Sequence, residues 1–276
     1  MIFNQKIAPL ITDTSLLHLM VEVGVAEVNF LFYSTAPFQL HGFYQPKIMG
    51  TIAEPKNMEL IKEFVSRDTF LSKPFASVKI AYNFKTCALM PKQFFKVEDK
   101  AAILNVMHGV DFSSYSFHED VQGGNIKLVY RVPCNVYDTF SNLFAKSIFM
   151  HSTSIQINNF KDKENFITCI VYNGYVKLML FKEKMLQIVQ YFDYSTPIEV
   201  SYHILNVCSQ FNVEVANVAL QVSGNIEPKS SLYEELYKYF LSISILPIPI
   251  AIQLAPTMQN LPTYYYNALT NLALCE

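Results

Sequence analysis

The chain has 276 residues, of which 51% are hydrophobic and only 16% are charged, and its formal net charge at pH 7 is -2. A chain of this length buries a sizeable core, as one large domain or two medium ones. Because phosphate binding draws on clustered Lys and Arg, the near-neutral charge without such a cluster excludes a nucleic-acid-binding protein. Low charge and many aromatic residues favour a surface that is buried against a protein partner or a second copy.

Cysteine usage and the first residues point to the cytoplasm. The cysteines are odd in number and form no CxxC pair, which is the pattern of reduced core thiols. They are Cys87, Cys134, Cys169, Cys208 and Cys275. The chain reaches Thr12 and Asp13 without an apolar stretch of signal-peptide length, so we expect a cytoplasmic protein.

The C-terminal stretch is uncharged, since no Asp, Glu, Lys or Arg lies between Tyr239 and Cys275. A membrane-spanning helix needs about 20 apolar residues, and Pro247 and Pro249 interrupt this run. The sequence therefore predicts no transmembrane span. It predicts a buried strand over 248–254, central in the sheet of the second half, and a last helix over 262–274.

The first half of the chain begins with strands. Residues 16–46 predict a three-stranded meander with turns near 24–26 and 34–37. Asn57 then begins a predicted helix that reaches residue 71, with an apolar face that includes Met58 and Ile61. Short strands over 77–82 and 87–90 follow, and Gly123-Gly124 predicts a hairpin turn. A helix that starts near Asn135 ends this half.

After about residue 148 the same order of elements begins again. A second meander is predicted over 166–192, with Gly174 at its first turn as Gly24 is in the first meander. Thr196, Pro197 and Glu199 predict a capped helix, a strand over 217–222 follows, and a further helix from Ser231 has an expected buried side that reaches Leu241. The repeat predicts an α/β protein with two βββαβαβα halves, 1–147 and 148–276.

This order is that of the actin-like ATPase (ribonuclease H-like) fold, and the sequence resembles an uncharacterised bacterial family, a domain of unknown function, that has this fold. Two sets of segments carry the resemblance. The C-terminal half of the family resembles the stretch LQIVQYFDYSTPIEVSYHILNVCSQFNVEVANVALQVSGNIEPKSSLYEELYKYF of this chain. Its N-terminal half resembles the segments LHLMVEVGVAEVNFLFY, KTCALMPKQFF and VYRVPCNVYDTF. The resemblance covers most of the chain and implies the fold. It carries little about function, because one fold hosts many roles.

The resemblance also implies where a nucleotide would bind. Active members of the wider superfamily bind ATP between their halves, and each half starts with an Asp-x-Gly turn whose acid positions Mg2+. Here the first turn reads Glu22-Val23-Gly24, and the second, Tyr172-Asn173-Gly174, has no acid. A single glycine, Gly224, stands where the adenosine-binding loop usually has a pair. If a nucleotide binds at all, we expect it to contact Glu22, Gly24, Gly174 and Gly224.

Other catalytic or metal-binding patterns are weak. His108 and His118, with Glu119 and Asp120 after them, lack ligand spacing, and a solvated loop is the expected structure there. Neither a phosphate loop nor a GxSxG or HExxH motif occurs. We therefore expect no catalytic residue, no metal and no cofactor.

Three functions remain open. The leading hypothesis is a non-catalytic actin-like scaffold, or pseudo-ATPase, that acts through protein contacts. The alternative is a true ATP-binding ATPase that uses Glu22 to position Mg2+. A membrane-associated assembly component is a further alternative that rests on fold analogy with pilus and secretion proteins.

Overall fold

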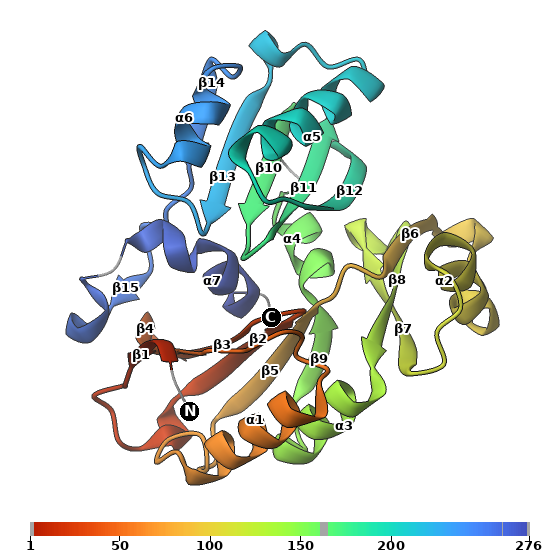
Figure 1. Ribbon diagram of the computed structural model, residues 1–276. Coiled ribbons are helices and arrows are strands. Elements are labelled where there is room, and N and C mark those ends of the chain that lie inside the picture. The colour runs from red at the N-terminus through yellow and green to blue at the C-terminus, as the bar shows by residue number, and fades with distance from the viewer. Residues whose placement is uncertain (1–2, 161–164, 261, 275–276) are drawn as a thin grey trace. The chain divides into compact units, whose positions relative to one another are not determined.

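The computed structural model describes residues 3–160, 165–260 and 262–274 (Figure 1). These residues form two compact units. The first contains the chain up to Asn158, the segment Ile250–Asn260 and the residues from Leu272 onward. The second contains Asn159–Pro249 and a segment that ends at Asn271.

The main sheet of the first unit has the strand order β1-β4-β3-β2-β5-β9, and β15 also pairs with β4. Its strands are β1 (Phe3–Ile7), β2 (His18–Gly24), β3 (Val28–Thr35), β4 (Phe38–Pro46), β5 (Ser77–Asn83), β9 (Ile148–His151) and β15 (Gln253–Leu254). Neighbours β2, β3 and β4 are antiparallel, whereas β5 is parallel to β2 and to β9. The predicted meander over 16–46 is confirmed.

Two helices, α1 (Pro55–Arg67) and α3 (Cys134–Leu143), contact each other in this unit. The predicted apolar face of α1 is confirmed, since Met58 and Ile61 are buried. The helix begins earlier than predicted, with Glu54 as its N-cap and Pro55 in its first turn. Asn57 lies inside the helix, where its side-chain amide donates to the carbonyls of Met49 and Thr51.

A small antiparallel sheet with the order β6-β8-β7 also belongs to the first unit, together with helix α2. These elements are β6 (Cys87–Pro91), α2 (Lys100–His108), β7 (Ser114–Val121) and β8 (Ile126–Pro133). Gly123, with a φ of 66°, and Gly124, with a φ of 86°, make the predicted turn between β7 and β8. Helix α4 (Ser152–Phe160) follows β9.

The sheet of the second unit has the order β12-β11-β10-β13-β14. Its elements are β10 (Phe166–Val171), β11 (Tyr175–Lys182), β12 (Met185–Asp193), α5 (Pro197–Gln210), β13 (Ala219–Gly224), α6 (Ser231–Tyr237) and β14 (Ser242–Ile245). Helices α5 and α6 pack on one face of this sheet through an apolar core that includes Val200, Ile204 and Leu236 (Figure 1). The capping box predicted at Thr196 and Glu199 is present at the start of α5.

The repeat predicted from the sequence is confirmed in the topology. In each unit an antiparallel meander leads, and its first strand pairs in parallel with a later strand that in turn pairs with another parallel strand. The order β4-β3-β2-β5-β9 thus corresponds to β12-β11-β10-β13-β14.

The prediction for the C-terminal stretch was wrong in two respects. Residues 248–254 do not form a central strand of the second half, because only Gln253–Leu254 is a strand and it pairs with β4 in the first unit. The last strand of the second sheet is β14, in a segment predicted to be the end of a helix. Helix α6 ends at Tyr237, and Leu241, which was expected on its buried side, is 83% exposed. The last helix begins as a 3-10 turn, Thr263–Tyr266, and continues as α7 (Asn267–Ala273).

Among the described residues the cysteines are free thiols, as predicted: Cys169 and Cys208 are buried, and Cys87 and Cys134 are half-buried. Burial raises the pKa of Cys169 to about 12 and that of Cys208 to about 11. Both thiols are therefore protonated at neutral pH and unreactive. Cys275 lies outside the described residues.

Candidate functional site

The first turn of the first unit places Glu22 and Gly24 at the end of β2. Glu22 is only 2% exposed, and the Asn29 side chain donates to its carboxylate over 3.4 Å. Gln45 in turn donates to Asn29 Oδ1 over 2.9 Å. Glu22, Asn29 and Gln45 lie side by side on β2, β3 and β4, so the carboxylate belongs to a polar row across three strands.

The backbone N–H of Gly24 is used within the hairpin between β2 and β3. Its N–H donates to the carbonyl of Glu27 over 2.9 Å, and the next carbonyl, that of Val25, accepts from Ile52 N–H over 2.7 Å. In the second unit the equivalent hydrogen bond is Tyr172 N–H to the carbonyl of Tyr175, also 2.9 Å. By hydrogen-bond register, Gly24 therefore corresponds to Tyr172, and Gly174 lies two positions further along.

This register corrects the sequence alignment of the two glycines and changes which residues correspond. Val23 pairs with Val28 as Val171 pairs with Val176, so Glu22 corresponds to Ile170 and Asn29 to Lys177. Where the first unit has a buried carboxylate, the second has an aliphatic side chain.

Lys177 is fully buried on β11. Its ammonium lies over the ring of Tyr191, 5.1 Å from the ring centre, and 5.8 Å from the ring centre of Tyr172. Aromatic faces attract a cation, so these rings stabilise the charge that the strand buries. The second unit thus has a lysine at the position that Asn29 occupies in the first.

Gly224 lies at the end of β13, opposite Val171 at the end of β10. Its φ is 86°, and a Cβ atom would lie 2.2 Å from the Val171 carbonyl oxygen. Asn225 N–H donates to the same oxygen over 2.8 Å. Glycine is thus required by the close approach of two strands, whether or not a ligand binds. The structure brings Gly174 and Gly224 to the same edge of the second sheet, where the parallel strands end.

A buried polar cluster in the first unit was missed by the sequence reasoning. Glu119 lies on β7, a strand and not the solvated loop expected there. It accepts hydrogen bonds from Tyr130 OH over 2.6 Å and from the backbone N–H of His151 over 2.7 Å, and also from Ser154 Oγ. Burial raises the pKa of Glu119 above its ordinary value, against the opposite effect of the three donors.

Glu119 therefore holds the start of α4 from the small sheet. His151 in the same cluster is fully buried; its Nε2 lies 3.1 Å from the carbonyl of Phe84, and its Nδ1 accepts from Thr153 N–H over 3.2 Å. These partners suit a neutral imidazole with the proton on Nε2. The cluster joins the two sheets of the first unit and gives its acid three hydrogen-bond donors. The sequence signal for it was the strand pattern over 114–121, which places Glu119 on an inward-facing position.

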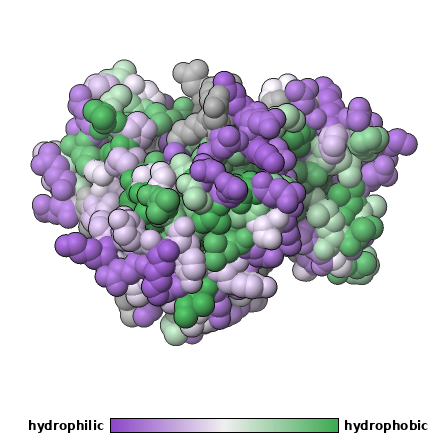
Figure 2. All heavy atoms as spheres, turned by 90° about the horizontal axis from the view of Figure 1, so that it is seen from above, coloured by the Kyte–Doolittle hydropathy of each residue, from purple (hydrophilic) through white to green (hydrophobic). Residues whose placement is uncertain are grey.

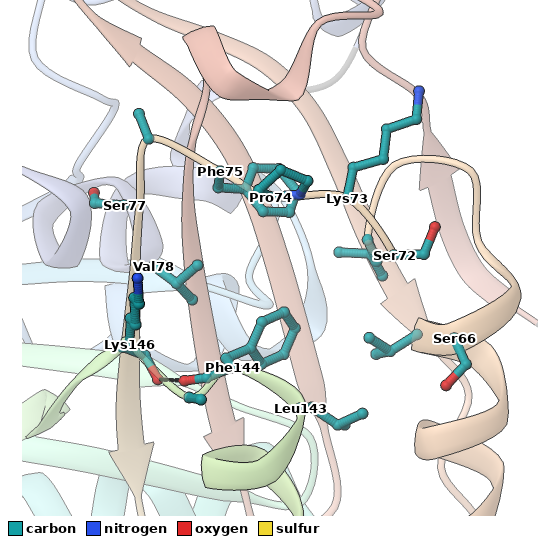
Figure 3. Close-up of a pocket in the computed structure, with 15 residues that line it drawn as sticks. Ser66, Ser72, Lys73, Pro74, Phe75, Ser77, Val78, Leu143, Phe144 and Lys146 are labelled. Atoms are coloured by element: carbon teal, nitrogen blue, oxygen red, sulfur yellow. Dashed lines mark hydrogen bonds between the residues drawn. The ribbon is translucent and has the colours of Figure 1, made fainter.

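A cavity of about 600 Å3 lies at the opposite end of the first sheet, where β5 begins (Figure 3). The hydroxyls of Ser66, Ser72 and Ser147 donate to backbone carbonyls of their own segments. Lys73 extends away from Phe144 in this view. The hydroxyl protons are therefore already engaged, while Lys73 and Lys146 also line the cavity. No residue expected to contact nucleotide lies in this lining.

Within the described part of the chain, no group of three His, Cys, Asp or Glu side chains could hold a metal ion. His118 packs against Phe95, with ring centres 5.1 Å apart, and His108 Nε2 lies 3.0 Å from the carbonyl of Cys87. No helix among the described residues is long and apolar enough to cross a membrane.

Known structures resemble the whole chain. It is similar to a Bacteroides thetaiotaomicron protein with an actin-like ATPase fold and unknown function, with a TM-score of 0.76 and 14% identity over 96% of this chain and 98% of that one. It is similar to a chain of the PilM–PilN type IV pilus biogenesis complex, with a TM-score of 0.64 and 12% identity over 93% and 97% of the two chains.

A third similar structure is the cytoplasmic domain of EpsL, an inner membrane component of the type II secretion system of Vibrio cholerae, with a TM-score of 0.51 and 10% identity over 94% and 96%. No curated protein matches the sequence significantly. At these identities the likenesses show the fold. The profile of one sequence family matches residues 10–243. The chain therefore has the actin-like ATPase fold and belongs to the family described as "Protein of unknown function (DUF3822)".

Proposed function

We propose that the protein is a non-catalytic actin-like scaffold with a degenerate nucleotide site, which acts through protein contacts in the cytoplasm. The observation that carries this proposal is the difference between the two first turns. Glu22 is the only acid at these positions, and its counterpart in the second unit is Ile170, next to the buried Lys177.

The chemistry of phosphoryl transfer explains why this difference matters. Catalysis of that reaction rests on Mg2+ and on groups that stabilise charge on the transferred phosphoryl. A hard dication prefers several oxygen ligands, whereas the second unit has Ile170 and Lys177 at the positions of Glu22 and Asn29, and neither side chain contains an oxygen atom. The Glu22 carboxylate is already hydrogen-bonded to Asn29, so its use as a metal ligand would require that contact to rearrange.

The similar structures agree with a role in assembly. One of them is part of a pilus biogenesis complex with PilN, and another is the cytoplasmic domain of a secretion-system membrane component. We extend from them only the class of role, contact with other proteins. A membrane-associated assembly component is the second form of this role, and fractionation of the native protein between cytosol and membranes distinguishes it.

A melting experiment tests the proposal. A ligand that binds only the folded state at about 100 times its dissociation constant adds about 2.7 kcal/mol to the free energy of unfolding. We expect ATP with Mg2+ to leave the melting temperature unchanged. A melting temperature that rises with ATP and Mg2+, but not with Mg2+ in the same buffer without nucleotide, would instead support the ATP-binding alternative.

A further inference from the structure

Helix α2 has apolar residues on all sides, but the rest of the protein covers only one side of the helix. Its sequence, KAAILNVMH, contains six apolar residues, and of these only Leu104 is fully buried. A helix that is hydrophobic all round is normally enclosed by protein. The small sheet beneath α2 covers one side, through a minor core of Ala88, Leu104 and Val129.

Further exposed apolar residues precede and follow the helix in the chain. We define the α2 patch as the six large apolar side chains of this segment that are at least half exposed: Phe94, Val97, Val106, Met107, Val110 and Phe112. Val106 is 88% exposed and Phe112 is 95% exposed. Figure 2 shows hydrophobic side chains gathered on the right-hand side of the molecule, where Figure 1 places α2.

The size of the α2 patch reaches the lower end of the range for one side of a standard protein interface. Large apolar side chains at these exposures offer about 100 Å2 each, so six of them offer about 600 Å2, against about 800 Å2 for each partner in a standard interface. The largest apolar patch on a monomeric protein is about 300–600 Å2 and is often functional, so the α2 patch stands at the upper end of that range. Ala101 and Ala102, which are also exposed on α2, allow another helix to approach closely.

The charges around the α2 patch favour a second copy of this chain over a charged partner. Residues 92–112 contain three lysines and three acids, so the surface is neutral and attracts neither polyanion nor polycation. A two-fold axis across α2 sets two copies of the helix antiparallel, and their dipoles then oppose each other.

We propose that the α2 patch is the interface of a two-fold symmetric homodimer, formed by α2 of each copy with the segments on either side of it. The proposal rests on the proposed scaffold role only in that it names a second copy of the chain as one of the scaffold's partners. Nucleotide binding tests the scaffold role and the oligomeric state tests the patch, so each can fail without the other.

Sedimentation velocity of the full chain, from about 1 to 100 µM, measures the dimer directly. We expect a concentration-dependent dimer for the native sequence. Val106→Glu and Phe112→Asp should each raise the dissociation constant at least about 100-fold, because a charge would be buried within the apolar contact.

Leu241→Glu is the matched control, since Leu241 is 83% exposed in the second unit and outside the α2 patch. It should leave the dimer unchanged. All three variants change exposed side chains, and equal melting temperatures will show that each is folded. A native chain that stays monomeric throughout, or a dimer that survives both patch variants, would overturn the proposal.

Discussion

At the scale of single residues, the two glycines of the second unit differ in what requires them. Gly174 has a φ of 80° with open space around the position of a Cβ atom, whereas at Gly224 a Cβ atom would meet the backbone of Val171. Neither property could be read from the sequence, in which both glycines stand at similar strand ends. The closeness of β10 and β13, and not contact with a ligand, is sufficient to explain Gly224.

Alanine substitutions separate these two requirements. Gly174→Ala should lower the free energy of unfolding by about 1 kcal/mol, the strain of a left-handed alanine. Gly224→Ala adds a clash with a strand backbone and should lower it by about 3 kcal/mol or more. Urea unfolding measures both. Equal effects would mean that the two strands separate easily, against the packing described.

The acid in the buried cluster is a second residue whose role depends on three-dimensional packing. Glu119→Ala leaves Tyr130, Ser154 and the His151 amide without their acceptor and should cost about 2–4 kcal/mol of folding free energy. Glu119→Gln should be tolerated, because its carbonyl oxygen accepts from Tyr130 and His151 while its amide donates to Ser154 Oγ.

The native protein and Glu119→Gln can also be compared as a function of pH. The pKa of Glu119 is raised in the folded state above its ordinary value of 4.5, so its contribution is fully present below that value and is lost as pH rises through the folded pKa. The stability of the native protein relative to Glu119→Gln should therefore fall from acidic to neutral pH. Unfolding curves at several pH values measure this difference; a relative stability that rises with pH would show a lowered pKa instead.

At the scale of elements, the sequence predicts the helices and strands that have a strong local signal, and it misses or misassigns those that lack one. The meanders have apolar runs separated by short turns, and the capping box at Thr196 fixes the start of α5 by itself. β1 and α2 were not predicted. β14 was mistaken for the end of a helix, because Phe240 continues the helical spacing of Leu232 and Leu236 while the chain has already left the helix.

The error over 248–254 has a different cause. A continuous apolar run is consistent with a buried central strand. In the structure Ile248 and Ile252 are buried while Ile250 is fully exposed, so the segment packs on alternate residues. Which sheet it joins depends on contacts with β4, more than 200 residues away in the sequence, and no local pattern encodes them.

Point substitutions in this segment test the packing. Met258 is fully buried in the first unit, and Ala255 N–H donates to the carbonyl of Leu40 over 2.8 Å nearby. Met258→Ala should cost about 2–4 kcal/mol through the cavity that it leaves. Ile250→Ser is the control and should be neutral. Equal melting temperatures of the two variants would contradict the assignment of this segment to the first unit.

At the scale of the whole molecule, the duplicated topology is what the sequence predicted best, since the order of elements survives errors at their ends. The halves 1–147 and 148–276 remain our proposal for the repeat itself. The compact units follow other limits, because Ile250–Asn260 belongs to the first unit. The candidate site was predicted only as a set of positions; the register that aligns Glu22 with Ile170 required the strand pairing.

The degenerate nucleotide site is the central claim of this account, and calorimetric titration of the full chain with ATP and Mg2+ tests it most directly. The account predicts no binding heat at nucleotide concentrations far above the micromolar range, because only one first turn has an acid and the other has Ile170 and Lys177. Glu22→Gln should then behave as the native chain does. A micromolar dissociation constant that Glu22→Gln abolishes, while the exposed-site control Glu63→Gln leaves it intact, would contradict the scaffold and establish an ATP-binding protein.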